Sequence, residues 1–594
     1  MSTYPSIPLA QTVVRLCEAA GIERIVICAG SRNAPLTNGF VSLPFFKTYS
    51  IVDERAAAFF ALGMAQQLKK PVALVCTSGS ALLNFYPAVA EAYYSDVPLV
   101  ILSADRMPHR IDIGDGQTIR QTGVFEPHLE TAAVLKPDVI HATETLLENP
   151  MQTLLPPLAT PKVVKEIQKE HQKHNEKEIV RVLETALQQS GPVHLNLPLE
   201  EPLYDTTSEK VPLPGVKTDK AVPQIEESQL ESLSELWHKH TKKWVIVGVL
   251  PPHSIQQKWV EALCEDPSVV VFTETTSNLS HSNAIYSIDT LMAPMEQVDE
   301  KWRAALQPEI LLTFGGMVVS KKIKAFLRKY RPQQHWHVDV KKAYNTYYCL
   351  TEHLKTTPQY FIKTLYSGQK KSVSDFQTFV RKPYTQFQGS GEEYLKKVGF
   401  SDLKVFEFLA AKWPSGYPLQ LANSSSIRYA QLFSWPAETP VFCNRGTSGI
   451  DGSTATAVGA AQLSEQPTVL ITGDLSFFYD INGLWNNYIP NNFKIILINN
   501  GGGGIFRILP GEKDSTKYDT YFETIHQRDA RYVAKAFGCK YRKATSLGAL
   551  KRKLPRFFNT NTAPQILEIQ TPRKLNDTVL LDYFKTMASK SIFS

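Results

Sequence analysis

The amino-acid sequence predicts an α/β protein built from three doubly wound parallel-sheet domains. Short apolar strands alternate with amphipathic helices along most of the chain. Many strands end in polar or small residues, as at the ligand-binding edge of a parallel sheet. The 594 residues exceed what one core can serve and indicate about three or four domains. We expect α/β domains over residues 1–203, 225–368 and 369–594, with a Pro-rich and Thr-rich linker over 204–224.

The composition limits the class of function. Hydrophobic residues make up 43% of the chain and charged residues 20%, which is typical of a soluble globular protein. No apolar run approaches the roughly 18 to 20 residues that span a bilayer, and the N-terminus lacks the pattern of a secretory signal. These observations predict a cytoplasmic protein without membrane insertion.

Cysteine usage and charge exclude two further classes. The seven cysteines lie far apart without a CxxC pair, so we expect buried reduced thiols and no structural zinc. The net charge of +7 is mild for this length and suits anionic small substrates. No basic stripe with interleaved aromatic residues indicates nucleic-acid binding.

Periodicity and turn signals place the elements in order. In the first domain we expect a helix over 7–20, strands over 24–29, 49–52, 71–76, 99–103 and 193–197, and a charged surface helix over 162–177. In the central domain we expect strands over 244–249, 269–272, 310–314 and 335–340. The third domain should hold strands over 419–422, 441–444, 468–472, 493–498 and 565–569. The first and third domains thus share an architecture without obvious sequence identity.

The most informative stretch is residues 467–506. A strand enters Gly473-Asp474, a helix is expected over 476–488, and a second strand ends in Asn500 before four glycines. Because the two strands are parallel, Asp474 and Asn500 should converge at one sheet edge. One carboxylate, one amide oxygen and free glycine carbonyls suit Mg²⁺ when phosphate oxygens complete its octahedron. The glycines allow close approach of a diphosphate, and the helix near Ser476 offers unpaired N–H groups to anions.

Two competing phosphate motifs fail on register. A dinucleotide fingerprint starting at Gly501 needs a third glycine where Phe506 stands, and the sequence around Gly511 lacks the lysine of a P-loop. The spacing of Gly473-Asp474 and Asn500 instead resembles the diphosphate-and-metal motif of thiamine diphosphate enzymes, with Leu475 where many members have glycine.

Glu54 is the most specific candidate for a functional residue in the first domain. A glutamate in a first helical turn ordinarily complements the helix dipole, but Asp53 beside it could do that. Thiamine diphosphate chemistry needs a carboxyl group in an apolar pocket to hydrogen-bond the aminopyrimidine ring, and the helix after Glu54 is almost wholly apolar. The resemblance therefore implies a catalytic role for Glu54.

Several separated blocks, in order, resemble one family, the 2-succinyl-5-enolpyruvyl-6-hydroxy-3-cyclohexene-1-carboxylate synthases of menaquinone biosynthesis. The blocks are residues 30–36, 53–55, 77–79, 104–106, 116–121, 444–452 and 473–475. The resemblance covers nearly the whole chain and is weakest over 140–180 and in the central domain. It implies a transferase, a thiamine diphosphate-dependent carboligase that decarboxylates 2-oxoglutarate and adds the succinyl unit to isochorismate.

The resemblance also implies a set of site residues. The catalytic residues would be Glu54 and Gln117. Thiamine diphosphate would contact Glu54, Thr77, Ser78, Gly79, Ile450, Gly473, Asp474, Leu475, Ser476, Asn500, Gly502 and Ile505, and Mg²⁺ or Mn²⁺ would bind Asp474, Asn500 and the Gly502 carbonyl. Substrates would contact Ser31, Arg32, Arg106, Gln117, Lys321, Lys322, Ser424, Arg428, Arg445 and Phe506.

The residue types agree with the implied substrates. Both substrates carry two carboxylates, which planar arginine side chains bind bidentately, and four arginines of this set lie at expected strand ends or helix starts. Many thiamine diphosphate-dependent decarboxylases use a His-His pair to protonate the carbanion, and the first domain has no such pair. By resemblance, Gln117 is the nearest matching polar group. A carbanion without an adjacent strong acid favours ligation over aldehyde release. Arg445 could serve either substrate.

Three alternatives stay open at this level. The chain could be another thiamine diphosphate-dependent 2-oxoacid carboligase or decarboxylase, or an inactive cofactor-binding regulatory homologue, whereas the failed fingerprints disfavour a nucleotide-dependent oxidoreductase. The resemblance implies a homodimer or homotetramer with active sites shared between subunits. The sequence does not distinguish dimer from tetramer, nor does it identify the physiological metal, kinetic constants or feedback regulators.

Overall fold

The structure is a computed structural model that describes residues 3–218, 223, 225–367, 373–508 and 515–588. The chain divides into two compact units, each described by itself. The first unit comprises Met1–Ala221, Gly446–Glu465 and Tyr479–Pro490. The second comprises Val222–Arg445, Gln466–Phe478 and Asn491–Ser594.

The first unit is organised around a six-stranded parallel sheet with the order β3-β2-β4-β5-β7-β6. Its strands are β2 (Arg24–Ile27), β3 (Lys47–Ser50), β4 (Val72–Cys76), β5 (Leu99–Asp105), β6 (Thr131–Val134) and β7 (Val193–Pro198). Its helices within the N-terminal segment are α1 (Pro8–Ala19), α2 (Ala34–Ser42), α3 (Glu54–Leu68), α4 (Ser80–Asn84), α5 (Tyr86–Ser95), η1 (Pro108–Arg110), α6 (Thr143–Glu148) and α7 (Pro161–Gln189). A short antiparallel pair, β1 (Tyr4–Pro5) and β8 (Thr206–Thr207), joins the segment's two ends.

Two later elements, α17 (Ser453–Ala461) and η3 (Ile481–Leu484), pack within the first unit. Helix α17 crosses α3 at very close range. A Cβ at Gly63 would lie 2.0 Å from the Thr456 carbonyl oxygen, and one at Gly459 would lie 2.0 Å from the Phe60 carbonyl oxygen. Each helix therefore meets the backbone of the other at a glycine, where a side chain would collide.

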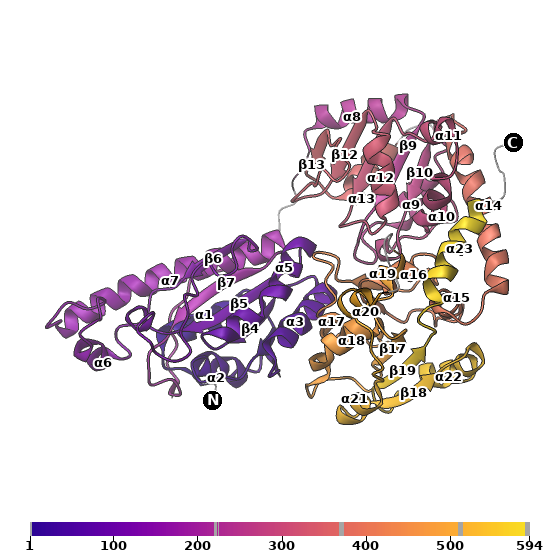
Figure 1. Cartoon of the computed structure of the whole chain (residues 1–594). Helices are drawn as coiled ribbons and strands as arrows, with labels where there is room; N and C mark the ends of the chain where they lie inside the picture. The colour runs from indigo at the N-terminus through magenta and orange to yellow at the C-terminus, as the bar shows by residue number, and fades with distance from the viewer. Residues whose placement is uncertain (1–2, 219–222, 224, 368–372, 509–514, 589–594) are drawn as a thin grey trace. The chain divides into compact units, whose positions relative to one another are not determined.

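The second unit contains two sheets. The central sheet has the parallel order β10-β9-β11-β12-β13. Its strands are β9 (Lys243–Val247), β10 (Val269–Phe272), β11 (Ile310–Phe314), β12 (Gln334–Val338) and β13 (Glu352–Leu354). The accompanying helices are α8 (Glu227–Lys239), α9 (Gln257–Cys264), η2 (Thr275–Ser277), α10 (Ile288–Met295), α11 (Glu300–Ala305), α12 (Lys321–Lys329), α13 (Pro358–Tyr366) and α14 (Phe376–Lys397) (Figure 1).

The C-terminal sheet has the parallel order β15-β14-β16-β17-β19-β18. Its strands are β14 (Leu419–Leu421), β15 (Val441–Cys443), β16 (Val469–Gly473), β17 (Lys494–Asn499), β18 (Lys540–Ala544) and β19 (Gln565–Gln570). Its helices are α15 (Asp402–Ala411), α16 (Ser425–Ala430), α18 (Asp474–Tyr479), α19 (Ile505–Ile508), α20 (Thr516–Tyr521), α21 (Arg531–Ala536), α22 (Leu547–Asn559) and α23 (Asn576–Ala588). When the strands of each six-stranded sheet are numbered along the chain, both sheets have the spatial order 2-1-3-4-6-5. This identity confirms the predicted shared architecture.

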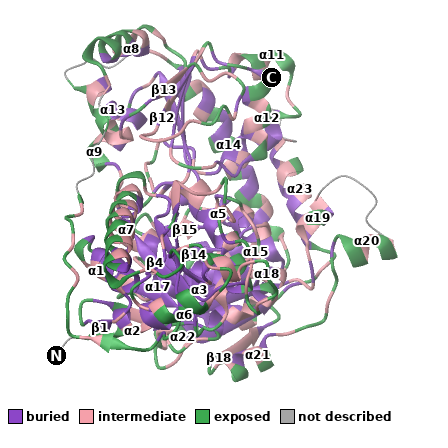
Figure 2. Ribbon diagram, turned by 90° about the vertical axis from the view of Figure 1, so that its left-hand side faces the viewer, coloured by how far each residue is buried: buried purple, intermediate pink, exposed green. Residues whose placement is uncertain are grey.

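Burial follows the sheets. Strands β4, β5, β7, β9, β11 and β17 are buried along their whole length, whereas helices such as α8 and α20 carry exposed residues (Figure 2). None of the seven cysteines forms a disulfide, and six are buried as predicted, whereas Cys349 is half-buried. Of the helices in the described ranges, none combines the length and the apolar character that crossing a membrane requires.

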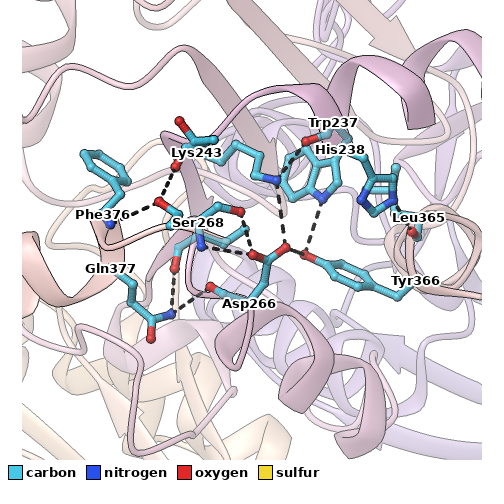
Figure 3. Close-up of polar contacts among 12 residues, drawn as sticks. Trp237, His238, Lys243, Asp266, Ser268, Leu365, Tyr366, Phe376 and Gln377 are labelled. Atoms are coloured by element: carbon cyan, nitrogen blue, oxygen red, sulfur yellow. Dashed lines mark hydrogen bonds and ion pairs between the residues drawn. The ribbon is translucent and has the colours of Figure 1, made fainter. Parts of the chain in front are cut away.

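A buried polar cluster lies at the amino end of β9 (Figure 3). The Lys243 ammonium is fully buried, donates to the Trp237 carbonyl oxygen at 2.8 Å and lies 3.8 Å from Asp266 Oδ2. Asp266 also accepts hydrogen bonds from the backbone and hydroxyl of Ser268 and from the Tyr366 hydroxyl. The Gln377 side chain donates to three carbonyl oxygens beside it, including that of Asp266. This cluster ties α8, α13 and α14 to the central sheet.

The structure corrects one predicted helix and adds five strands, of which β1 and β8 form the short antiparallel pair. The helix expected over 476–488 begins earlier, at Asp474, and ends at Tyr479. The chain leaves the helix because the buried Asp480 carboxylate accepts the backbone N–H groups of Thr454 and Ala455. Strands β6, β13 and β18 were not predicted, and each lies at a sheet edge.

Candidate active site

The ends of β16 and β17 bring Asp474 and Asn500 to one sheet edge, as predicted from their spacing. The two strands are hydrogen-bonded neighbours, and Asp474 is almost fully buried just beyond β16. Its Oδ2 accepts the N–H groups of Gly501 at 2.8 Å and Gly502 at 3.0 Å, while Oδ1 accepts the N–H of Leu475 at 2.7 Å. The carboxylate is therefore held by three backbone donors and has one orientation.

Asn500 has one satisfied and one unsatisfied end. Its Nδ2 donates to Asp402 Oδ2 at 2.9 Å, and Asp402 is fixed in turn by the Thr571 hydroxyl at 2.6 Å. Burial raises the pKa of Asp402 to about 6, and these hydrogen bonds oppose the rise. Asn500 Oδ1 is buried and has no hydrogen-bond partner among the described residues. A buried acceptor without a donor is costly unless a ligand satisfies it.

The glycine loop after Asn500 adopts a conformation that requires glycine. Gly501 has φ +80° and Gly502 has φ +154°. A Cβ at Gly502 would lie 2.6 Å from the Glu523 carbonyl oxygen, which also accepts the N–H of Gly503. The Gly502 carbonyl accepts one N–H, from Gly504 at 2.9 Å, and keeps a second lone pair.

These oxygens fit a divalent cation shared with a diphosphate. Asp474, the unsatisfied Asn500 oxygen and the Gly502 carbonyl offer three protein ligands, too few for a closed cage. In the part of the chain that the structure describes, no group of three His, Cys, Asp or Glu side chains could hold a metal by itself. Gly473 ends β16, and Ser476 is buried in the first turn of α18.

His526 and Glu523 were missed by the sequence analysis. His526 Nε2 lies 3.3 Å from Asp474 Oδ2, and its Nδ1 accepts the Arg528 N–H at 3.1 Å, which leaves the ring proton on Nε2. The buried Glu523 carboxylate binds Arg507 at 3.0 Å and Arg573 at 2.7 Å, anchoring the helix that carries Ile505 and Phe506. Both lie in an irregular stretch without a motif, so no local pattern could have found them.

The first unit presents a second group of candidate cofactor residues. Thr77 and Ser78, after β4, are buried, and their hydroxyl groups have no partner among the described residues. Asp53 caps α3 by accepting the Ala56 N–H at 3.0 Å, so Glu54 is not needed as a cap. The half-buried Glu54 carboxylate accepts the Asn84 side-chain amide at 3.3 Å, a partner that sequence reasoning missed.

Two further candidates, Ile450 and Gln117, belong to the same unit. Ile450 is 37% exposed and precedes α17, whose N-cap Gly452 packs directly on the Phe59 ring of α3. Gln117 is exposed and has φ +57°, and its backbone lies 3.2 Å from where a Cβ of Gly79 would be.

Arg32 and Arg106 are brought together by an acidic residue that the sequence analysis did not single out. Arg32 is buried and donates to the Leu199 carbonyl oxygen and to Glu201 Oε1, both at 3.0 Å. Arg106 NH1 lies 4.0 Å from the same Glu201 oxygen. Ser31, beside Arg32, is exposed. Both guanidinium groups therefore lie within 4.0 Å of the same carboxylate oxygen.

Two carboxylates, Glu274 and Asp289, lie near the substrate candidates of the second unit. Arg428 donates to the Ser424 carbonyl oxygen and Arg445 to Asn423 Oδ1. Burial lowers the pKa of Arg428, and the charge of Arg445 lowers it further. Glu274 accepts the N–H groups of Val319 and Ser320 at the start of α12, and burial raises its pKa to about 7.

Helix α12 itself begins with the two predicted lysines. Lys321 is exposed, whereas Lys322 pairs with Glu296 at 2.7 Å. The half-buried Asp289 accepts the Ser320 hydroxyl. The charges of Lys322 and Arg428 lower its pKa, against the larger effect of desolvation, which raises it. Glu274 and Asp289 were not predicted as site residues.

Two family models match this chain. The thiamine pyrophosphate enzyme N-terminal TPP binding domain matches residues 7–131, and the corresponding C-terminal TPP binding domain matches residues 424–569. The chain is similar to a solved putative thiamin diphosphate-dependent enzyme from Mycobacterium smegmatis, with TM-score 0.66 and 15% identity over 95% of this chain and 99% of that one. The two matched domains identify the chain as a thiamine pyrophosphate enzyme, and the similarity of the folds confirms the predicted fold class.

Curated relatives narrow the class. A 2-succinyl-5-enolpyruvyl-6-hydroxy-3-cyclohexene-1-carboxylate synthase of Christiangramia forsetii is 51% identical over 99% of this chain and 100% of its own length. Relatives with the same name from Flavobacterium johnsoniae and Porphyromonas gingivalis are 49% and 35% identical over 98% and 99% of this chain, and over 100% and 99% of their own lengths. The chain belongs to the 2-succinyl-5-enolpyruvyl-6-hydroxy-3-cyclohexene-1-carboxylate synthase family.

Proposed function

We propose that the chain decarboxylates 2-oxoglutarate and adds the succinyl unit to isochorismate, releasing CO₂ and forming 2-succinyl-5-enolpyruvyl-6-hydroxy-3-cyclohexene-1-carboxylate. This transferase reaction belongs to menaquinone biosynthesis. The observation that carries the proposal is full-length similarity, at 51% identity, to a relative that bears this name. The buried, unsatisfied Asn500 oxygen beside Asp474 supports an intact cofactor site.

Metal and cofactor would bind the second unit as follows. Asp474, Asn500 and the Gly502 carbonyl would hold Mg²⁺ or Mn²⁺, and the backbone of Gly473, Leu475 and Ser476 would meet the diphosphate. Asp402 orients the Asn500 amide so that its oxygen remains available. When bound, thiamine diphosphate supplies the carbon nucleophile and electron sink that decarboxylation requires.

The remaining cofactor contacts would come from residues that surround the rings. Thr77, Ser78 and Gly79 would face the pyrimidine end, Ile450 and Ile505 would pack against the cofactor, and Glu54 would hold a proton at the aminopyrimidine ring. We also propose a homodimer or homotetramer in which Glu54 of one subunit and Asp474 of another serve the same cofactor, as the family resemblance implies.

Cations would bind the substrate carboxylates. Ser31, Arg32, Arg106 and Gln117 would face isochorismate together with Lys321 and Lys322. Ser424 and Arg428 would hold the distal carboxylate of the succinyl unit, Arg445 would serve one substrate or the other, and Phe506 would wall the pocket. The residue types of Arg428 and Arg445 support the proposal, because guanidinium groups bind carboxylates through two parallel hydrogen bonds.

The test is direct. The protein is incubated with thiamine diphosphate, Mg²⁺, 2-oxoglutarate and isochorismate, and the product is identified by mass. Parallel reactions replace 2-oxoglutarate with pyruvate. Product only with pyruvate would favour another carboligase or decarboxylase, and cofactor binding without turnover would favour an inactive regulatory homologue. We also propose domain boundaries at residues 203, 224 and 368, which limited proteolysis would check. We propose a cytoplasmic location as well, which cell fractionation would check.

Subunit sharing has its own test. A Glu54→Gln chain and an Asp474→Ala chain, each nearly inactive alone, should regain activity after mixing and subunit exchange. Each mixed dimer contains one intact site, so random mixing should restore about a quarter of wild-type sites. No recovery, when native mass spectrometry shows that mixed dimers have formed, would mean that each chain builds its own site.

A further inference from the structure

One buried amide in the first unit connects the candidate cofactor residues to the candidate substrate residues. Gln121 is 1% exposed and lies at the end of the loop that carries Gln117. Its Oε1 accepts the N–H of Gly79 at 2.9 Å. Its Nε2 donates to Asn196 Oδ1 at 2.7 Å and to the Ala104 carbonyl oxygen at 3.3 Å. With one donor on one side and acceptors on the other, only one orientation of the amide satisfies the site.

From Asn196 the connection continues to Arg106. Asn196 Nδ2 donates to Asp105 Oδ2 at 2.7 Å, and Asp105 Oδ1 accepts the backbone N–H of Arg106 at 2.8 Å. Asn196 and Asp105 are 2% and 3% exposed, so water does not compete for these bonds. A chain of buried hydrogen bonds thus runs from the turn after β4, through β7, to the end of β5.

The same amide fixes the loop that carries Gln117. The backbone of Gln117 lies against Gly79 so closely that a Cβ there would approach its carbonyl oxygen to 3.2 Å. Gly79 has φ +88°, a conformation that favours glycine. The Gln121 bond to the Gly79 N–H therefore sets the distance between the turn and the Gln117 backbone.

We propose that Gln121 is a positioning residue that fixes the turn of Thr77 to Gly79, and with it Gln117, relative to the strand end that carries Arg106. The role rests on the proposed function, because it holds the cofactor group and the isochorismate group in register. Displacements of about 1 Å from such a change can reduce rates by about a hundredfold.

The experiment compares Gln121→Met with Gln11→Met. Gln11 is a matched control in the same unit: it is 2% exposed and makes three buried or partly buried hydrogen bonds, to the Pro5 and Glu209 carbonyl oxygens and from the Val211 N–H. Both variants should lower the thermal midpoint by similar amounts, because each leaves comparable polar groups unsatisfied.

Three readouts separate positioning from stability. In the cofactor-free protein, hydrogen exchange of the peptide containing Gly79 should be faster in Gln121→Met than in Gln11→Met. Calorimetry should show weaker thiamine diphosphate binding in the presence of Mg²⁺, and the KM for isochorismate should rise about tenfold or more, while the KM for 2-oxoglutarate changes little. Gln11→Met should match wild type in all three.

A second variant keeps the proposal testable if Gln121→Met does not fold. Gln121→Glu retains an oxygen for the Gly79 N–H and loses the donor toward Asn196, so the turn should stay protected while the isochorismate KM rises. The proposal would be overturned if Gln121→Met lay within twofold of Gln11→Met in Gly79 exchange, cofactor binding and isochorismate KM, or if Gln121→Glu left the isochorismate KM unchanged. If the wild type makes no product, the proposed function fails, whereas the exchange and cofactor-binding measurements still decide the role of Gln121.

Discussion

Two buried polar clusters in the second unit differ in how completely the protein satisfies them. Around Lys243 and Asp266, the ammonium and hydroxyl groups donate hydrogen bonds to carbonyl and carboxylate oxygens, and the Trp237 ring lies 4.7 Å from the ammonium (Figure 3). Around Asp474, three backbone donors orient the carboxylate, yet Asn500 Oδ1 has no donor among the described residues. A closed cluster stabilises the fold, and an incompletely satisfied one reserves atoms for a ligand.

The largest expected effect comes from removing the Asp474 carboxylate, which belongs to the incompletely satisfied cluster. Asp474→Ala should abolish thiamine diphosphate binding, because the three proposed protein ligands would already leave the metal dependent on the diphosphate. Calorimetry with Mg²⁺ measures it, and Asp529→Ala, which removes a partly exposed carboxylate 3.8 Å from Lys543, is the control. Wild-type affinity in Asp474→Ala would falsify the metal-site assignment.

Glu54→Gln extends the comparison to the first unit. The variant should fold and bind cofactor, because Gln keeps the shape and Asp53 retains the cap. Activity should fall by about 10² to 10⁴, the usual contribution of a positioned proton-transfer group. Proton exchange at the reactive thiazolium carbon of the bound cofactor, followed by NMR, should slow in parallel; an unchanged exchange rate contradicts the role.

The closed cluster should respond in stability rather than in activity. Asp266→Ala leaves the Lys243 ammonium buried without its anionic partner, which should reduce the free energy of unfolding by about 3 to 5 kcal/mol. Urea unfolding measures the loss, and turnover per folded, cofactor-loaded chain should stay within about twofold of wild type. A selective loss of turnover with unchanged stability would reverse the distinction between the clusters.

The smallest expected effect is a pH dependence of stability. Burial lowers the pKa of Lys243 to about 8, against the opposing charges of Asp266 and Glu309, from 10.5 in an unfolded chain. Between these values the unfolded state binds a proton that the folded state does not, so this contribution to stability is fully present above pH 10.5 and is lost as the pH falls to 8. The unfolding free energy of the wild type minus that of Lys243→Met should rise between pH 8 and pH 10.5. A difference that does not change with pH would contradict this prediction.

Sequence reasoning succeeded where the chemistry is local. Asp474 and Asn500 terminate neighbouring parallel strands, so their spacing alone predicted convergence, and the glycines between residues 501 and 504 marked the loop. It missed the residues that orient them, because Asp402, Glu523 and His526 reach the site from distant or irregular segments. Strands β6, β13 and β18 escaped because edge strands such as β18 (KYRKA) lack a continuous apolar run. The long helix predicted over 476–488 failed because propensity did not anticipate the tertiary contacts of Asp480.

The contact between Gly502 and Glu523 also bears on redesign of this enzyme. Their backbones are too close for any side chain at position 502, and Glu523 is locked by two arginines from separate elements. Grafting the glycine loop alone into another scaffold would therefore lose the surface that shapes it. The transferable module is a composite of residues 499–507 and 515–528 together with Arg573, and chimeras that divide it should express folded protein in which the glycine loop has lost its shape.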